Sequence, residues 1–403
     1  MSHPAPVILG DDFIQDAHAV AASLRTTSPV RFVLLPGGFP VWLVSGYSEA
    51  RLVMTDARFS SDRVYDRLAR LRVGPDEEVS FSDDLVMNLL NLDPPDHTRL
   101  RRLVTKTFTR RAVEPLRPRI AAIAADLLTA MQGRDVVDLV SEYAAPLPIR
   151  VICELLGVPF EDRDDFTGWT RRMVAATNQE EIGAASTELA AYLGVLVDAK
   201  RQSPSDDLLS ELVQAVDDGD RLSRRELIAT ASLLLTGGFE TTVNLIGSGM
   251  DALLRNPDQL ALLRTDRSLL PNAIEEFLRY ETPNNLSSPR FTTEDVELGG
   301  ALIPAGHFVM VSWLAVNRSG QFTDPDRLDV TRPAGGHLAF GHGMHHCVGA
   351  ALARLEGEIA FGALLDRFPQ LELVSGDKPA RWLHSTAMHG LESLVVRTGE
   401  PRR

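Results

Sequence analysis

The sequence lacks the features that mark secreted, membrane-spanning and nucleic-acid-binding proteins. Only two cysteines, Cys153 and Cys347, occur in 403 residues, which is typical of a reducing compartment and predicts no disulfide. No run reaches the roughly 18 consecutive apolar residues of a membrane span, and the N-terminus has no signal-peptide pattern. The formal net charge of −14 argues against nucleic acid as a partner. We therefore expect a cytoplasmic protein with neither a membrane nor a nucleic-acid partner.

The chain does have enough length and apolar content for a large core. It is 403 residues long and 44% hydrophobic, and length alone would allow two or three domains. Near the N-terminus, residues 29–56 show two β-rich runs around Gly37-Gly38, which predicts strand, turn, strand. The motifs described below favour one large, mostly helical domain.

Residues 340–356 carry the strongest chemical signal, because a glycine-rich loop there encloses Cys347 and then becomes helical. The glycines are Gly341, Gly343 and Gly349, and Leu352, Leu355 and Ile359 follow at helical spacing. A helix N-terminus offers unpaired N–H groups and a positive dipole end, and both stabilise a thiolate. Glycines let the backbone approach a flat ligand closely.

Three interpretations of this loop compete. A lone buried cysteine most often behaves as a small hydrophobe. Zinc is the second, because His342, His345 and His346 crowd around Cys347, but the second ligand pair of a structural zinc site is not evident. The third is haem, whose iron takes a cysteine thiolate as proximal ligand.

The pattern Phe340-Gly341-x-Gly343-x-His345-x-Cys347-x-Gly349 resembles the haem-binding loop of the cytochromes P450. Six specified positions within ten residues make the signal specific. The resemblance implies that Cys347 is the axial ligand of the iron of haem b, and that Phe340, His345 and Gly349 contact the cofactor.

The second signal is a long helical pattern from Arg224 to Arg255. Ser223 and Glu226 form a predicted capping box at its start. Apolar residues then occupy most faces, which indicates a buried helix. Gly237, Gly238 and an acid lie in its middle. Glycine destabilises a helix interior and an acid is unexpected on a buried helix, and positions with such unfavourable residues are often functional.

This glycine pair with the following acid and threonine resembles the distal helix of the P450 family. The resemblance implies that Gly237 and Gly238 open the helix to admit O2, with Gly238 at the cofactor. It also implies that Glu240 and Thr241 are catalytic residues that deliver protons. Phe239 stands where many bacterial relatives carry histidine.

Basic residues mark the expected propionate contacts. His97 and Arg101 are four apart and share one face of a predicted helix. The segment around them resembles the family's propionate-binding segment, and the resemblance adds Arg290 and His345 to that set.

Residues 99–119 hold eight basic residues and one acid, Glu114. Such a run is usually a solvated face. The resemblance implies instead a docking face for an acidic electron donor, here a ferredoxin served by a ferredoxin reductase.

Glu276 and Arg279 lie at helical spacing, where a pair is commonly an exposed surface ion pair. Their order between the other motifs resembles the family's buried Glu-Arg pair. The resemblance gives the pair a structural role and adds a second arginine, Arg327.

The resemblance also implies a substrate pocket built from separate segments. One lies within residues 75–92, another includes the distal glycine Gly237, and the others precede Arg290 and lie near the C-terminus. The candidate pocket residues are Met87, Leu89, Leu90, Gly237, Asn285, Leu286 and Met388.

The chain thus resembles a soluble bacterial P450 over nearly its whole length. The implied fold is mostly α with small β sheets, as one domain over residues 1–403. The implied reaction inserts one oxygen atom from O2 into a C–H bond of a hydrophobic small molecule, as a tailoring step in polyketide- or macrolide-like, antibiotic-type secondary metabolism. The alternatives are epoxidation, desaturation or oxidative ring coupling, or a haem-binding protein without catalysis.

Overall fold

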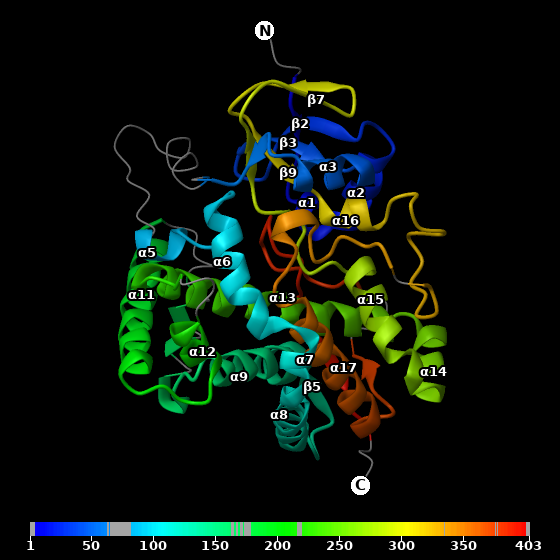
Figure 1. The fold of residues 1–403 in the computed structure, drawn as a ribbon. Coiled ribbons are helices and arrows are strands. Elements are labelled where there is room, and N and C mark those ends of the chain that lie inside the picture. Colours follow the sequence, from blue (N-terminus) through cyan, green and yellow to red (C-terminus); the bar gives the residue numbers. More distant parts are fainter. Residues whose placement is uncertain are drawn as a thin grey trace. The chain divides into compact units, whose positions relative to one another are not determined.

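The computed structural model describes residues 5–62, 64, 82–162, 165–166, 168–169, 172, 179–215, 220–333, 335–374, 376 and 378–399 (Figure 1). Within these residues helices dominate and the strands form small sheets, as the sequence predicts. The predicted pocket segment 75–92 is described only from residue 82 onward.

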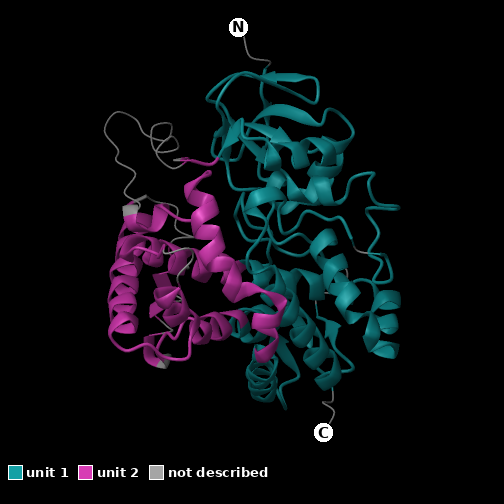
Figure 2. Ribbon diagram, in the orientation of Figure 1, with its two compact units in different colours: residues 1–60, 116–147, 241–403 teal, residues 61–115, 148–240 magenta. Residues whose placement is uncertain are grey.

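The chain forms two compact units, each built from segments that are far apart in the sequence (Figure 2). Unit 1 comprises Met1–Ser60, Leu116–Leu147 and Thr241–Arg403, and unit 2 comprises Ser61–Pro115 and Pro148–Glu240. Helix α13 (Arg224–Leu254) passes from unit 2 into unit 1. The expectation of a single domain stays a prediction.

Unit 1 contains most of the strands and the helices around the C-terminal half. Its helices are α1 (Asp12–Gln15), α2 (Ala17–Arg25), α3 (Tyr47–Thr55), α8 (Arg117–Ala130), α14 (Pro257–Thr265), α15 (Leu270–Tyr280), α16 (Trp313–Asn317) and α17 (Ala350–Arg367). Its strands are β1 (Val7–Ile8), β2 (Val30–Leu34), β3 (Pro40–Val44), β4 (Phe59–Ser60), β5 (Val136–Asp138), β6 (Arg290–Thr292), β7 (Val296–Leu298), β8 (Ala301–Ile303), β9 (Phe308–Val311), β10 (Glu372–Leu373) and β11 (Val395–Arg397). Shorter turns of helix are Val140–Ala144, Arg267–Leu269 and Gly343–His345.

The largest sheet of unit 1 has the strand order β1-β2-β3-β9-β6-β4. The predicted strand, turn, strand is its β2–β3 hairpin, which pairs antiparallel from Val30 opposite Val44. Gly37 and Gly38 connect the strands at φ +87° and +82°, a backbone conformation that favours glycine. Apolar side chains such as Trp42 fill the core beneath the sheet.

The helical core of unit 1 supports α17, the helix that follows the Cys347 loop. Helix α17 packs against α8 and α15. Phe361 of α17 stacks on Phe277 of α15, with ring centroids 4.7 Å apart. A Cβ on Gly249 of α13 would come within 2.9 Å of Phe361, so α13 can lie this close only with glycine there. Close packing of three helices therefore fixes α17.

Unit 2 is helical in its described part. Its helices are α5 (Asp83–Val86), α6 (Asp96–Thr105), α7 (Arg110–Val113), α11 (Gln179–Gln202) and α12 (Leu208–Gln214), with α9 (Pro146–Leu155) entering from unit 1. Short 3₁₀ turns lie at Lys106–Phe108, Glu114–Leu116 and Phe160–Asp162. Residues 180–202 of α11 are long and apolar enough to span a membrane, but half of their most apolar window is buried in the protein, as in a core helix.

The start of α13 confirms the predicted capping box. The main-chain N–H of Ser223 donates to Oε2 of Glu226 at 2.7 Å, and the Glu226 N–H donates to Oγ of Ser223 at 3.3 Å. Two otherwise unpaired N–H groups at the helix N-terminus are thereby satisfied.

Candidate functional site

The Cys347 loop is held by its own main chain. The N–H of Cys347 donates to the carbonyl oxygen of Phe340 at 2.8 Å. Gly341 and Gly343 have φ of +72° and +70°. A Cβ on Gly343 would lie 2.6 Å from the carbonyl oxygen of Met54, so glycine is required for both conformation and space. The loop therefore presents Cys347, whose side chain is exposed, in a defined position.

The loop ends at the N-terminus of α17, which begins three residues after Cys347. Gly349 is the residue at the N-cap position, and a Cβ there would lie 3.9 Å from Sγ of Cys347. The thiol is thus close to the positive end of an 18-residue helix, which favours its thiolate form.

A cation–π contact and an ion pair connect this loop to α15. The Arg354 guanidinium lies 4.5 Å from the centroid of the Phe340 ring. Its Nη2 also donates to Oε2 of Glu275 at 2.9 Å, and His337 Nε2 is 3.0 Å from the same oxygen. Burial opposes the ionisation of Glu275, but the hydrogen bonds from Arg354 and His337 outweigh it and lower the pKa of Glu275 to about 2. An ionised Glu275 therefore anchors both sides of the loop.

A second carboxyl, Glu356, lies two residues beyond Arg354 on α17. It is only 2% exposed, and its Oε2 has no hydrogen-bond partner among the described residues. Burial raises the pKa of Glu356 well above its usual value, because nothing compensates for the lost hydration. Burial therefore disfavours the ionised form of Glu356.

Two predicted propionate contacts belong to unit 1. Arg290 lies in β6, is 5% exposed, and donates from Nη1 to the carbonyl oxygen of Phe59 at 3.0 Å. His345 ends the short Gly343–His345 helix and is half-buried. Sheet pairing of Arg290 with Val309 fixes the backbone from which its side chain starts.

The predicted distal residues lie within α13. The helix continues as an α-helix through Gly237 and Gly238, and the expected opening for O2 stays a prediction. A Cβ on Gly238 would meet the Ile152 side chain no closer than 3.6 Å, an ordinary contact. Glu240 and Thr241 are both half-buried, on the first turn after the glycines.

The predicted basic segment of unit 2 begins on α6. His97 is 2% exposed, whereas Arg101 is half-buried and Arg102 is exposed. Arg99 is not part of a simple solvated face, because it forms ion pairs with Glu226 and, at 3.3 Å, with Asp220.

Of the predicted pocket residues in unit 2, Leu89 is buried at 4% exposure. Met87 and Leu90 are 37% and 38% exposed. Gly237 is exposed on α13. These side chains therefore do not form one buried cluster within unit 2.

In unit 1 the structure brings together the two other predicted pocket segments. Asn284 pairs with Met388 as a β-bridge, and the N–H groups of Asn285 and Leu286 both donate to the carbonyl oxygen of Ala387. The Asn285 side chain is buried, and its place in the pocket stays a prediction. Its amide is 3% exposed and donates to the carbonyl oxygen of Phe13 at 3.3 Å, because a buried amide needs a partner.

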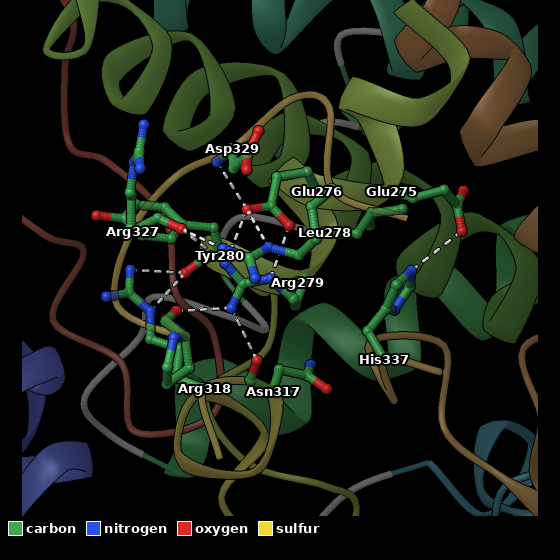
Figure 3. A network of polar contacts seen from close by, with 12 residues as sticks. Glu275, Glu276, Leu278, Arg279, Tyr280, Asn317, Arg318, Arg327, Asp329 and His337 are labelled. Carbon is green, nitrogen blue, oxygen red and sulfur yellow. Dashed lines mark hydrogen bonds and ion pairs between the residues drawn. The ribbon is translucent and has the colours of Figure 1, made fainter. Parts of the chain in front are cut away.

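The Glu276–Arg279 pair is the centre of a buried polar network (Figure 3). Arg279 donates to both carboxylate oxygens of Glu276, at 2.7 and 2.8 Å. Its remaining donors reach the carbonyl oxygens of Asn317, Pro325 and Arg327. All five N–H groups of a guanidinium are thus satisfied.

The second arginine of this network was predicted wrongly. Arg332, not Arg327, places its guanidinium on Glu276, with Nε 3.2 Å from Oε1. Arg327 contributes its main-chain carbonyl oxygen, which accepts from Arg279 and from Arg332. The turn after Pro325 directs the carbonyl oxygen of Arg327 toward Arg279. Arg332, five residues later, brings its side chain to Glu276.

A hollow of about 550 Å³ lies on the surface of unit 1 beside α3. It is lined by Tyr47, Ser48, Arg51, Leu52, Thr55, Gln321 and His342. Arg51 donates from Nε to Nε2 of His342 at 3.3 Å. Burial and the Arg51 charge lower the pKa of His342. His342 therefore contacts Arg51 here, and the hollow does not include Cys347.

Known proteins match this chain over nearly its whole length. A family model described as cytochrome P450 matches residues 167–393. Cytochrome P450 107B1 of Saccharopolyspora erythraea is 49% identical over 399 residues, which are 98% of this chain and 98% of that protein. The chain belongs to the cytochrome P450 family. Another P450 of the same organism, 6-deoxyerythronolide B hydroxylase, is 44% identical to this chain, and the match covers 97% of this chain and 98% of the hydroxylase. The structure of the tirandamycin C-bound P450 monooxygenase TamI matches with a TM-score of 0.90 and 48% identity, covering 98% of this chain and all of that one.

The chain is therefore a P450 monooxygenase with the mostly helical P450 fold, and the family implies a haem-thiolate cofactor. The Cys347 loop fits that cofactor, because the exposed thiol stands on a rigid loop at a helix N-terminus. The zinc interpretation does not fit. Among the described residues, Cys347 belongs to no group of three histidine, cysteine or carboxylate side chains whose ligand atoms converge.

Sequence reasoning missed the link from Arg354 through Glu275 to His337. A signal was available, because Glu275 and Glu276 stand side by side in an otherwise apolar helix segment. Two adjacent acids on such a helix point in different directions, and each needs its own partner.

Proposed function

We propose that this P450 hydroxylates a C–H bond of a hydrophobic polyketide- or macrolide-like molecule. The reaction would be a tailoring step in the biosynthesis of an antibiotic-type secondary metabolite. The observation that carries the proposal is near-complete coverage of relatives whose names give such substrates. One is a 6-deoxyerythronolide B hydroxylase, and another is a monooxygenase bound to tirandamycin C.

In this proposal Cys347 is the axial ligand of haem b. The haem, when bound, supplies the activation of O2. Phe340, Gly349 and Gly238 would contact the cofactor. The helix dipole of α17 would favour the ionised form of Cys347. The fixed loop would hold the thiolate in position for the iron.

The remaining predicted site residues take roles consistent with their chemistry. Arg290 and His345 of unit 1 would bind propionates through charge-assisted hydrogen bonds, and we assign His97 and Arg101 of unit 2 the same ligand. Thr241 would hold and pass a proton, because a hydroxyl both donates and accepts. Glu240, as its neighbour, would exchange that proton with solvent.

We also propose that electrons come from a ferredoxin and a ferredoxin reductase in the cytoplasm. Arg102, Lys106, Arg110 and Arg111 are exposed on consecutive turns of unit 2, in a chain whose net charge is −14. A local basic surface of this kind attracts an acidic partner and mainly increases its association rate.

The axial-ligand assignment is tested with the reduced carbon monoxide complex. The parent should show the red-shifted Soret band of thiolate ligation, and Cys347→Ser should lose it. Cys153→Ala is the matched control, because Cys153 is the other cysteine and is buried in unit 2. Loss of the band in the control alone, or its survival in Cys347→Ser, would show that Cys347 is not the ligand.

The reaction is tested with a surrogate ferredoxin, its reductase, NADH and a panel of macrolides and linear polyketides. Product mass, together with the position of the new oxygen by NMR, distinguishes the candidates, because hydroxylation and epoxidation add the same mass. A gain of one oxygen at a saturated carbon supports hydroxylation, whereas loss of two hydrogens indicates desaturation or ring coupling. A gain of one oxygen across a double bond indicates epoxidation. Substrate-dependent Soret shifts without any product would indicate a haem-binding protein that does not turn over.

A further inference from the structure

Two histidines and a glutamate converge in unit 1, and none of the three belongs to the Cys347 loop. His18 lies on α2, Glu281 directly follows α15, and His389 lies on the C-terminal loop before Gly390. His18 Nε2 is 3.0 Å and His389 Nε2 is 2.8 Å from the same atom, Oε2 of Glu281. All three ligand atoms lie within 4.8 Å of one another.

The cluster is rigid on one side and open on the other. The side chains of Glu281 and His389 are 8% and 3% exposed. The His389 N–H donates to the carbonyl oxygen of Pro283 at 2.9 Å, and its ring stacks on Trp382 with centroids 3.9 Å apart. His18 is 30% exposed, so solvent reaches the cluster from its side.

One neighbouring cation shapes the cluster. Arg318 is held against Tyr280, with Cζ 3.7 Å from the ring centroid and Nη2 2.8 Å from the carbonyl oxygen. Its Nη2 lies 3.4 Å from Oε1 of Glu281 and 3.4 Å from Nε2 of His18. Oε1 of Glu281 is thus shared by Arg318 and by His18, whose Nε2 lies 3.1 Å from it, whereas both imidazoles reach Oε2.

We propose that His18, Glu281 and His389 form a binding site for a Zn²⁺-like transition-metal dication. Two imidazole nitrogens and one carboxylate oxygen, with a fourth position open to water, are a donor set that zinc takes in proteins. Ligand bonds of about 2.0–2.2 Å in a tetrahedron place the donors roughly 3.4 Å apart. The two contacts to Oε2 would each lengthen by about half an ångström. The partly exposed His18 side chain can rotate to supply its share, and the buried His389–Glu281 contact must open by a small shift of its own.

The ion would join three segments that are far apart in the sequence. It would hold α2 and the C-terminal loop to the end of α15. His389 directly follows Met388, and Asn285 lies four residues after Glu281. Binding therefore fixes the two paired segments 284–286 and 387–388, with a gain in the thermal stability of the folded state.

The test uses tag-free holoenzyme that has been dialysed against a chelator and then titrated with zinc sulfate alone. The parent should bind one Zn²⁺ per chain by calorimetry and gain thermal stability, and His18→Gln should bind at least tenfold more weakly. His18 is the partly exposed ligand, so this variant keeps the buried pair of Glu281 and His389. His384→Gln is the matched control, because His384 contacts Asp11 at 3.0 Å in an exposed pair without a third ligand.

Equal zinc affinity in the parent and His18→Gln, or no saturable binding by the parent, would overturn the proposal. A second variant tests the position of the ion. Arg318→Gln removes a like charge beside the site, so zinc should bind more tightly than in the parent. Weaker binding by a folded Arg318→Gln, judged by an unchanged carbon monoxide spectrum, would contradict the assigned ligands.

Discussion

Arg279 and Glu276 form an ion pair in which neither side chain is exposed, with Nε of Arg279 2.7 Å from Oε2 of Glu276. Their partners are main-chain groups of the segment around Pro325 and the guanidinium of Arg332. The pair therefore joins α15 to the chain that leads to the Cys347 loop. The attraction between the two charges roughly offsets the free energy that they lose by leaving water. The main role of the pair is therefore to hold that part of the chain in one arrangement.

Removing one partner of this pair should destabilise the protein strongly. Glu276→Ala leaves the buried Arg279 charge without a counter-charge, and we expect a loss of about 3–5 kcal/mol in the free energy of unfolding. Denaturant unfolding measures it. Arg397→Ala is the control, because its pair with Glu372 is exposed, and it should leave the unfolding midpoint almost unchanged. Equal midpoints for the two variants would contradict the structural role.

The corrected second arginine gives a matched comparison within the same network. Arg332→Ala removes the guanidinium on Glu276 and the bonds to three main-chain carbonyls. Arg327→Ala keeps the main-chain carbonyl that Arg327 contributes. We expect Arg332→Ala to be the less stable variant, by about 1–3 kcal/mol in denaturant unfolding. The opposite order would restore Arg327 as the second arginine.

Thr241→Ala should uncouple electron use from product formation. Alanine preserves the helix, so stability and haem content should change little. If the hydroxyl delivers protons as proposed, its loss should divert electrons to hydrogen peroxide. NADH consumption should stay comparable while product per NADH falls severalfold, and a peroxide assay should account for the difference.

Thr236→Ala is the control for that experiment. Thr236 lies on the same helix, and its hydroxyl donates to the carbonyl oxygen of Ser232 at 2.8 Å. It should keep the parent's ratio of product to NADH. If Thr241→Ala keeps that ratio too, Thr242 becomes the better candidate.

Glu275 should make stability depend on pH in acid. Its pKa falls from 4.5 to about 2 on folding, so its contribution is fully present above pH 4.5 and is lost as the pH falls toward 2. That contribution is on the order of 3 kcal/mol. The free energy of unfolding of the parent minus that of Glu275→Gln should therefore shrink across this window. A difference that stays constant there would show that Arg354 and His337 do not hold Glu275 ionised.

The local features of this protein could be predicted from its sequence. The Gly37-Gly38 hairpin, the Ser223–Glu226 capping box and the Cys347 loop all depend on residues close in the sequence, the most distant being the paired Val30 and Val44 of the hairpin. Turn, cap and loop chemistry acts over that range, so a short pattern is enough to determine it. The Glu276–Arg279 pair could be predicted for the same reason, because its two residues are three positions apart on one helix face.

The long-range partners were decided only by the tertiary structure. Arg332 rather than Arg327 reaches Glu276, and the Asn285 amide donates to the carbonyl oxygen of Phe13. The His18–Glu281–His389 cluster joins residues up to 371 positions apart, as 389 − 18 shows. A buried polar group must find a partner, but which segment supplies it depends on how the whole chain packs. The sequence by itself determined which residue types and local turns were present, and packing determined which of them meet.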